Sequence, residues 1–325
     1  MHDLAVSPLD IERAARTIKS YTVRTPLIEN PVLNGIAGGR VLLKAENLQR
    51  TGSFKFRGAF NALSNLSVDD KRAGVFAISS GNHAQGVAEA ARLLDIAATI
   101  LMPSDAPRLK RERTERSGAA VVTFDRATAP RDEVVARYQA EHQSVFVAPF
   151  DNPHVIAGQG TAGLEMAEDL IAMDIRPDAA IVCCGGGGLS AGVATALAAH
   201  FPDIEIVTSE PVGFDDFARS LETGEPQENA ALAGSIQDAI ITVAPGKLTF
   251  PILKRLRAHG VRVSDEEALD AMAFAYRELK LVLEPGGAAA LAAALNKRVD
   301  MKERTVLVVL SGGNVDADVF ARAIS

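Results

Sequence analysis

Short runs of apolar and β-branched residues recur along the chain and alternate with stretches whose apolar residues follow helical spacing. The runs are typical of buried strands, whereas HAQGVAEAARLL and SDEEALDAMAFAYRELK are typical of amphipathic helices. This alternation predicts an α/β protein with parallel sheets covered by helices on both faces. The expected strands are VLLKAEN from residue 41, GVFAIS from 74, AATILMP from 97, AVVTF from 120, SVFVAPF from 144, AAIVCC from 179, IEIVTSE from 204 and TVLVVL from 305.

The first helix has a recognisable start. Ser7 can act as its N-cap, Pro8 suits the first helical position, and the carboxylate of Asp10 can reach back to the cap. We expect this helix to continue to about Ser20.

The length of the chain favours two domains. Its 325 residues exceed the usual size of one domain, and 47% hydrophobic with 23% charged residues is an ordinary globular composition. No internal repeat and no proline- or glycine-rich linker marks a boundary. The strand and helix patterns from about 74 to 147 form one compact group, and a second series begins near 150.

Charge and terminal sequence limit the partners and the location. The formal net charge of -7 disfavours binding to nucleic acid or to anionic membranes. The locally basic stretch RLKRERTER, residues 108–116, interleaves glutamates with its cations and is typical of a solvated helix face. The N-terminal residues lack the features of a signal peptide, and no apolar run is long enough to span a membrane. We therefore expect a cytoplasmic protein.

The two cysteines, Cys183 and Cys184, are neighbours in the sequence. A disulfide between neighbours would be strained, because consecutive α-carbons lie closer than disulfide geometry prefers. We interpret both as reduced, buried strand residues, which agrees with a reducing compartment.

The segment TGSFKFRGA, residues 51–59, follows the strand from 41 and runs into a helical pattern. It places Lys55 near the start of a helix, where the positive end of the helix lowers the pKa of an amine. A lysine with a lowered pKa can attack a carbonyl or transfer protons at neutral pH. A lysine beside aromatic residues is otherwise commonly a surface residue.

The segment SSGNHAQG, residues 79–86, follows the strand GVFAIS and opens a helix. Small and amide residues at a helix N-terminus present free backbone N–H groups, which bind a carboxylate or a phosphate. The alternative is a cluster that only caps the helix.

Four successive glycines, Gly185, Gly186, Gly187 and Gly188, follow the strand AAIVCC and precede another helix. Glycines permit positive φ and leave no side chain between backbone amides and an anion. The segment therefore predicts a phosphate site without choosing the cofactor.

A dinucleotide site is the alternative interpretation of the same glycine segment. Gly186, Gly188 and Ala191 have the GxGxxA spacing, and Glu210 ends the next predicted strand at a suitable distance. A nicotinamide-dependent oxidoreductase would, however, leave Lys55 and the loop from Ser79 without a role.

The segment LSGGNVD, residues 310–316, ends the strand TVLVVL. Ser311 can form a hydrogen bond with a ligand at the strand end. Taken alone, the segment is more typical of a glycine turn that terminates a strand.

Together, and in this order, the four segments resemble the fold-type II pyridoxal-phosphate enzymes, most closely the threonine/serine dehydratase and serine racemase branch. The resemblance covers essentially the whole chain. It implies that Lys55 carries the cofactor, with Phe54 packed beside it, and that Gly185 to Gly188 hold its phosphate. It also implies that Ser311 bonds the pyridine nitrogen. Further implied positions are Glu284 and Asn82 near the cofactor ring and a substrate-carboxylate loop made of Ser79, Ser80, Gly81, Asn82 and His83.

The resemblance also implies an architecture like that of the tryptophan synthase β subunit. Residues 1–73 and 148–325 would build a large cofactor-binding domain, and residues 74–147 a small mobile one. Each domain would be an open, mostly parallel sheet flanked by helices. The family likeness suggests a homodimer.

The segment SEPVGFDDF is similar to the divalent-cation site of serine racemases and some dehydratases. Glu210, the carbonyl of Phe214 and Asp216 would supply oxygen ligands, which suit Mg²⁺ or Ca²⁺. Exposed carboxylates in a loop otherwise serve solubility alone.

The resemblance implies elimination of water from a small β-hydroxy amino acid such as L-threonine or L-serine, giving a 2-oxo acid and ammonia. Lys55 would be the base. A serine or hydroxyaspartate racemase is the main alternative, with Ser80 as a second acid/base on the opposite face. Thiol-incorporating synthases of this fold and a non-catalytic binding protein are less favoured.

One departure concerns the substrate. Many relatives carry Ala-Asp-Gly where this chain has Gln237, Asp238 and Ala239, in a stretch that shapes the substrate end of the pocket. The identity of the substrate therefore stays open among threonine, serine, hydroxyaspartate and bulkier hydroxy amino acids. Because the chain ends at Ser325, we expect no C-terminal regulatory domain.

Overall fold

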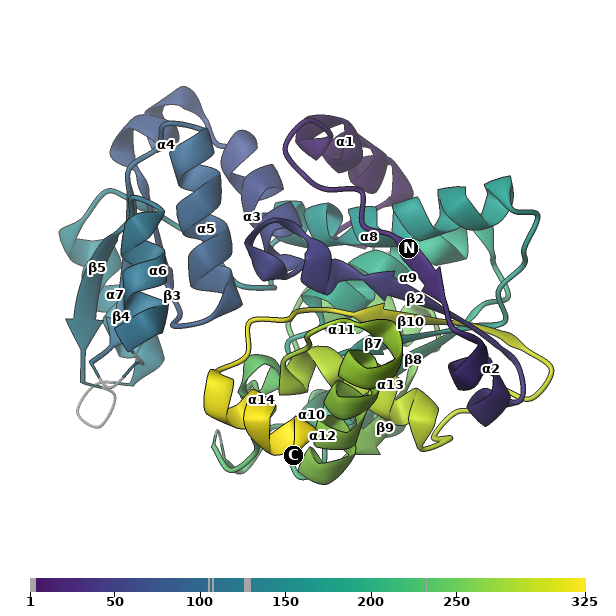
Figure 1. The fold of residues 1–325 in the computed structure, drawn as a ribbon. Helices are drawn as coiled ribbons and strands as arrows, with labels where there is room; N and C mark the ends of the chain where they lie inside the picture. The colour runs from purple at the N-terminus through teal and green to yellow at the C-terminus, as the bar shows by residue number, and fades with distance from the viewer. Residues whose placement is uncertain (1–3, 105, 107, 126–129, 232) are drawn as a thin grey trace.

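The computed structural model describes the chain except for residues 1–3, 105, 107, 126–129 and 232. Two sheets flanked by helices make up the described part (Figure 1). The α-helices are α1 (Pro8–Ile18), α2 (Pro31–Ala37), α3 (Lys55–Ser64), α4 (Val68–Ala73), α5 (Asn82–Leu93), α6 (Arg108–Arg116), α7 (Arg131–Glu141), α8 (Pro153–Ala172), α9 (Gly188–His200), α10 (Asp216–Thr223), α11 (Thr249–Arg255), α12 (Asp265–Phe274), α13 (Pro285–Leu295) and α14 (Ala317–Ile324). Shorter helical segments are η1 (Glu46–Leu48), η2 (Arg50–Gly52), η3 (Asp238–Ile240) and the π-helix η4 (Ala275–Leu279).

The larger sheet has six strands in the order β1-β2-β10-β7-β8-β9. The edge strand β1 is antiparallel to β2, and the other neighbours are parallel. Every residue of β7 is buried, as expected for a strand with helices on both faces. In Figure 1, α8 and α9 lie on one side of this sheet and α12 and α13 on the other. The strands are β1 (Leu27–Glu29), β2 (Arg40–Ala45), β7 (Ala179–Cys183), β8 (Glu205–Pro211), β9 (His259–Val263) and β10 (Thr305–Leu310).

The smaller sheet has four parallel strands in the order β5-β4-β3-β6. It lies at the left of Figure 1 with α5, α6 and α7 around it. All its strands come from the segment expected to form the small domain, although the domain boundaries themselves stay a prediction. The strands are β3 (Val75–Ile78), β4 (Ala98–Pro103), β5 (Ala120–Phe124) and β6 (Val145–Phe146).

All eight strands expected from the apolar runs are present, but two others were not expected. β1 is only three residues long, which is too short to show a pattern. β9 has the sequence HGVRV, in which a histidine, a glycine and an arginine interrupt the apolar character. α1 begins as predicted, with Ser7 as N-cap and Asp10 closing a capping box, and ends at Ile18.

The residues around Lys55 connect two hydrophobic cores. Phe54 belongs to the main core around the larger sheet. Phe56 and Phe60 belong to a second core, together with Val75 of the smaller sheet. Lys55 therefore lies where the two cores meet, and the start of α3 is held from both sides.

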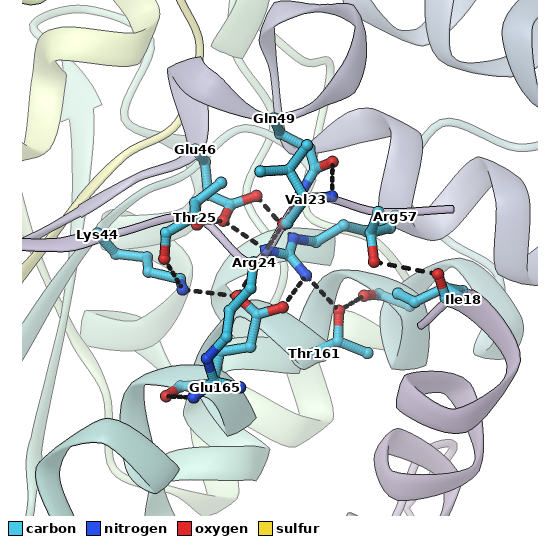
Figure 2. Close-up of polar contacts among 12 residues, drawn as sticks. Ile18, Val23, Arg24, Thr25, Lys44, Glu46, Gln49, Arg57, Thr161 and Glu165 are labelled. Atoms are coloured by element: carbon cyan, nitrogen blue, oxygen red, sulfur yellow. Dashed lines mark hydrogen bonds and ion pairs between the residues drawn. The ribbon is translucent and has the colours of Figure 1, made fainter. Parts of the chain in front are cut away.

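A buried cluster of charged residues fixes the other side of α3 (Figure 2). The guanidinium of Arg57 donates to both carboxylate oxygens of Glu46, at 2.7 and 2.8 Å, and to those of Glu165, at 2.7 and 2.9 Å. Lys44 donates to Glu165 at 2.6 Å, and Thr25 donates to Glu46 at 2.5 Å. Two cations and two carboxylates thus neutralise one another and join η1, α3 and α8.

Both cysteines are free and buried, as expected, with Cys183 at the end of β7 and Cys184 directly after it. Residues 108–116 form α6, as the charge pattern indicates. Within the described residues, none of the helices combines the length and the apolar character that crossing a membrane would require.

Candidate active site

A cavity of about 330 Å³ lies at the carboxyl ends of strands from both sheets. Parallel α/β sheets commonly bind ligands at this edge. The structure brings every residue predicted to contact cofactor or substrate to the wall of this one cavity. They are Phe54, Lys55, Ser79, Ser80, Gly81, Asn82, His83, Gly185, Gly186, Gly187, Gly188, Glu284 and Ser311.

Lys55 is the first residue of α3, as predicted, and its side chain reaches the cavity. Its Nζ donates a hydrogen bond to the carbonyl of Pro149 at 2.9 Å and lies 5.1 Å from the centre of the Phe54 ring. Withdrawal from water lowers the pKa of Lys55 to about 8, and the positive charge of Arg131 acts in the same direction. Burial is thus the main cause of the lowered pKa, whereas the sequence pattern had indicated the positive end of the helix as the cause. A substantial fraction of the amine is neutral near pH 8.

The four glycines form a tight loop between β7 and α9. Gly187 has a φ of +86°, which favours glycine. A Cβ at Gly186 would lie 2.4 Å from the ring of Phe150, so a side chain is excluded there. The loop leads directly into the N-terminus of α9, whose first backbone N–H groups have no partner within the helix. This arrangement can hold a phosphate.

The loop from Ser79 to His83 lies across the cavity and opens α5 at Asn82. The side-chain amide of Asn82 donates to Glu284 at 2.6 Å, and its oxygen accepts from Asn314 at 2.8 Å. These bonds tie a loop of the smaller sheet to two loops of the larger one.

His83 is a buried, neutral imidazole. Its Nε2 lies 2.8 Å from the carbonyl of Val147, which can only accept, so Nε2 carries the proton. Burial and, secondarily, the charge of Lys55 lower the pKa of His83 to about 3. His83 therefore offers the unprotonated Nδ1 as an acceptor at neutral pH.

Residues 18–312 match the model of a family described as pyridoxal-phosphate dependent enzyme. The chain belongs to this family. The family cofactor carries a phosphate, an aldehyde and a pyridine ring. One cavity contains a suitable partner for each of these groups. The glycine loop suits the phosphate, the amine of Lys55 suits the aldehyde, and the hydroxyl of Ser311 suits the ring nitrogen.

Several pyridoxal-phosphate enzymes are similar to this chain over nearly its whole length. L-threonine ammonia-lyase of Thermotoga maritima is 41% identical over 97% of this chain and 77% of its own length. L-threo-3-hydroxyaspartate ammonia-lyase of a Pseudomonas species is 41% identical over 96% of both. The solved structure of serine racemase from Dictyostelium discoideum has a TM-score of 0.88 at 38% identity, over 96% of this chain and 99% of that one. The predicted fold-type II architecture is confirmed.

The sequence did not reveal every residue of the cavity wall. Pro149 and Phe150 follow the carboxyl end of β6, just as the predicted loops follow other strands. Their position after a predicted strand could therefore have indicated them from the sequence. Arg131 begins α7 and lines the cavity, yet nothing in its surrounding sequence sets it apart. Asn314 lies within the segment LSGGNVD, in which only Ser311 was predicted.

Glu210, Phe214 and Asp216 lie outside this cavity wall. Glu210 accepts hydrogen bonds from the backbone N–H groups of Phe217 and Ala218, at 2.9 and 2.7 Å, and Asp216 accepts one from Asn229 at 2.6 Å. Burial raises the pKa of both carboxyl groups. Among the residues that the structure describes, no group of three or more histidine, cysteine, aspartate or glutamate side chains forms a metal site.

The position of Glu210 also argues against a dinucleotide site. An acidic residue that binds a ribose must face the ligand of the glycine loop. The carboxylate of Glu210 is instead fully buried against the start of α10.

Proposed function

We propose that this enzyme eliminates water from a small β-hydroxy amino acid, such as L-threonine or L-serine, to give a 2-oxo acid and ammonia. The observation that carries the proposal is the position of Lys55. Its partly neutral amine lies in one cavity with a glycine loop suited to phosphate and an amide-rich loop suited to a carboxylate. The relatives named as ammonia-lyases support the same reaction.

In this proposal the protein binds and orients the cofactor and the substrate, and it moves protons. When bound, pyridoxal phosphate supplies an electron sink for the bond broken at the substrate α-carbon. Lys55, with Phe54 packed beside it, accepts the α-proton as a general base. Ser311 would donate to the pyridine nitrogen, and Glu284, which accepts from the side-chain amide of Asn82, would orient that residue in the same cavity. Backbone N–H groups of Gly185 to Gly188 would hold the phosphate.

The substrate carboxylate would bind to the loop of Ser79, Ser80, Gly81, Asn82 and His83, at the N-terminus of α5. We propose a different residue, Arg131, as the neighbour of the substituent on the substrate β-carbon. Arg131 lines the cavity, and among the described residues no carboxylate lies within ion-pair distance of it. A substrate with an acidic side chain, such as 3-hydroxyaspartate, would offset this charge.

The test is an absorbance spectrum followed by an assay of 2-oxo acid with L-threonine, L-serine and L-threo-3-hydroxyaspartate. We expect an absorbance band of bound cofactor and release of oxo acid from at least one substrate. Lys55→Ala should lose the band characteristic of the wild type and all measurable turnover. A Lys55→Ala variant with full activity would refute the proposal.

Racemisation is the second candidate, because Ser80 lines the same cavity as Lys55. A serine hydroxyl on the opposite side of the α-carbon could return the proton there. A wild-type protein that interconverts L- and D-serine without releasing oxo acid would favour this reaction.

We further propose a divalent cation, Mg²⁺ or Ca²⁺, held by Glu210, Asp216 and the carbonyl of Phe214. The two buried carboxylates support it, since no lysine, arginine or histidine of the described chain lies within ion-pair distance of either. Oxygen donors of this kind suit hard cations.

The remaining proposals concern the whole protein. We propose a homodimer in the cytoplasm that acts on a free amino acid and binds neither nucleic acid nor membrane. The net charge of -7 supports the last two points. We also propose that residues 74–147 move as a small domain, because their sheet is separate from the larger one.

A further inference from the structure

Cys183 and Ser311 face each other at the carboxyl ends of neighbouring strands. Cys183 ends β7 and Ser311 follows β10, and these strands pair in parallel. The Cys183 thiol donates a hydrogen bond to the Ser311 hydroxyl oxygen, with 3.1 Å between Sγ and Oγ. Each residue is 3% exposed, and both line the active-site cavity. The contact is therefore shielded from bulk water and adjoins the ligand site.

The backbone of Ser311 is fixed on both sides. Its N–H donates to the carbonyl of Gly287 at 3.3 Å, and its carbonyl accepts from the N–H of Phe54 at 3.1 Å. Phe54 is the residue before Lys55, so the same contacts relate Ser311 to the lysine. With the backbone held, the remaining freedom of Ser311 is the rotation of its side chain and of its hydroxyl proton.

The hydrogen-bonding capacity of Ser311 leaves one proton available. A serine hydroxyl has one proton to donate and two lone pairs. One lone pair accepts from Cys183, and within the described residues no group accepts the proton. Burial raises the pKa of Cys183 to about 11, so the thiol keeps its own proton at neutral pH. Ser311 is thus arranged as a donor toward a ligand in the cavity.

We propose that Cys183 is a positioning residue that holds the Ser311 hydroxyl as a hydrogen-bond donor to the pyridine nitrogen of bound pyridoxal phosphate. The inference rests on the proposed contact of Ser311 with that nitrogen. A hydroxyl that donates to the nitrogen leaves that nitrogen unprotonated, and the donation is reliable only if the rotation of the hydroxyl is fixed. Cys183 supplies that restraint through its hydrogen bond to the Ser311 hydroxyl oxygen.

The neighbouring cysteine provides a matched control. Cys184 is as deeply buried, at 1% exposure, and its thiol lies 3.4 Å from the carbonyl of Gly185, a residue of its own segment. It has no hydrogen bond with Ser311. Replacing either cysteine by alanine removes the same side chain from the same strand end, but only one replacement frees the hydroxyl.

The experiment compares Cys183→Ala, Cys183→Ser, Cys184→Ala, Ser311→Ala and the double variant Cys183→Ala/Ser311→Ala. The readouts are the dissociation constant of pyridoxal phosphate, the absorbance band of the bound cofactor, and the Tm of the cofactor-free protein as a control for folding. We expect Cys183→Ala to weaken cofactor binding roughly three- to tenfold, as loss of one hydrogen bond would. Cys183→Ser should recover most of the loss, and Cys184→Ala should stay within about twofold of the wild type.

The double variant gives the sharpest result. If Cys183 acts only through Ser311, then Cys183→Ala has no further effect on cofactor affinity once Ser311 is alanine. Independent effects, in which the two fold-changes multiply, would overturn the proposal, as would an equal loss in Cys184→Ala. Because the readout is cofactor binding, failure here is distinguishable from failure of the elimination assay.

Discussion

Lys55 and His83 show how one cavity changes two basic side chains in the same direction. Burial lowers the pKa of both, to about 8 for the amine and about 3 for the imidazole. The positive charge of Lys55 also contributes to the lowered pKa of His83. A basic group that stays uncharged is useful for proton transfer, but it reduces stability whenever the unfolded chain can take up the proton.

We predict the effect of His83 on acid stability from this shift. Between pH 6.5 and about 3 the unfolded histidine binds a proton and the folded one does not, so stability falls as the pH falls through this range. At pH 5 the loss relative to pH 8 should be about 2 kcal/mol. Urea unfolding at both pH values should show that loss in the wild type and not in His83→Gln. The exposed His200→Gln serves as control, and equal pH dependence in all three proteins would contradict the prediction.

Arg131 determines a second prediction at the scale of one residue. Arg131→Gln should lower kcat/KM for L-threo-3-hydroxyaspartate by roughly tenfold or more relative to L-threonine, because it removes the charged partner of the acidic side chain. Steady-state assays with both substrates measure the ratio. An unchanged ratio would mean that the guanidinium does not contact the β-substituent.

At the scale of elements, the helix that begins at Lys55 depends on a charged cluster as well as on apolar packing. Arg57 is completely buried and bonds to Glu46 and Glu165, which come from η1 and α8 (Figure 2). Such a cluster holds segments in one relative position, since its bonds are directional. It also carries a large penalty if one member is lost.

Removing the central cation should therefore destabilise the protein strongly. We expect Arg57→Met to lower the free energy of unfolding by about 3–5 kcal/mol, because buried carboxylates lose their partner. The exposed pair Arg72 and Asp69 is the matched control, and Arg72→Met should change stability by less than about 1 kcal/mol. Chemical denaturation compares the two. Similar small effects would show that the cluster adapts by admitting water.

The elements also show what the sequence could and could not predict. Strands such as β7 were evident because burial on both faces requires a continuous apolar run, and the loops after them placed the cavity residues correctly. β9 was missed because it is partly exposed and mixed in composition. Arg131 was missed because its approach to the cavity depends on how the smaller sheet packs, which no local pattern encodes.

At the scale of the whole molecule, the proposed cation would link stability to metal concentration. A ligand that binds only the folded protein raises its stability by mass action. The two carboxylates come from the end of β8 and the start of α10, so a shared ion would join a strand to the helix after it.

We predict that millimolar Ca²⁺ or Mg²⁺ raises Tm by several degrees and that a chelator reverses the change. Glu210→Gln should remove this response while keeping a cofactor spectrum. Thermal unfolding with and without metal is the measurement. A Tm that changes with neither metal nor chelator would contradict the proposed cation site.

The position of Lys55 between Phe54 and Phe56 has a consequence for how the protein assembles. These neighbours belong to different cores, so the lysine reaches its place only after both cores have formed and met. Neither core, with the elements packed around it, could bind the cofactor alone. Recovery of cofactor absorbance during refolding would then report the last step of assembly, the joining of the two halves, and should lag behind the return of secondary structure.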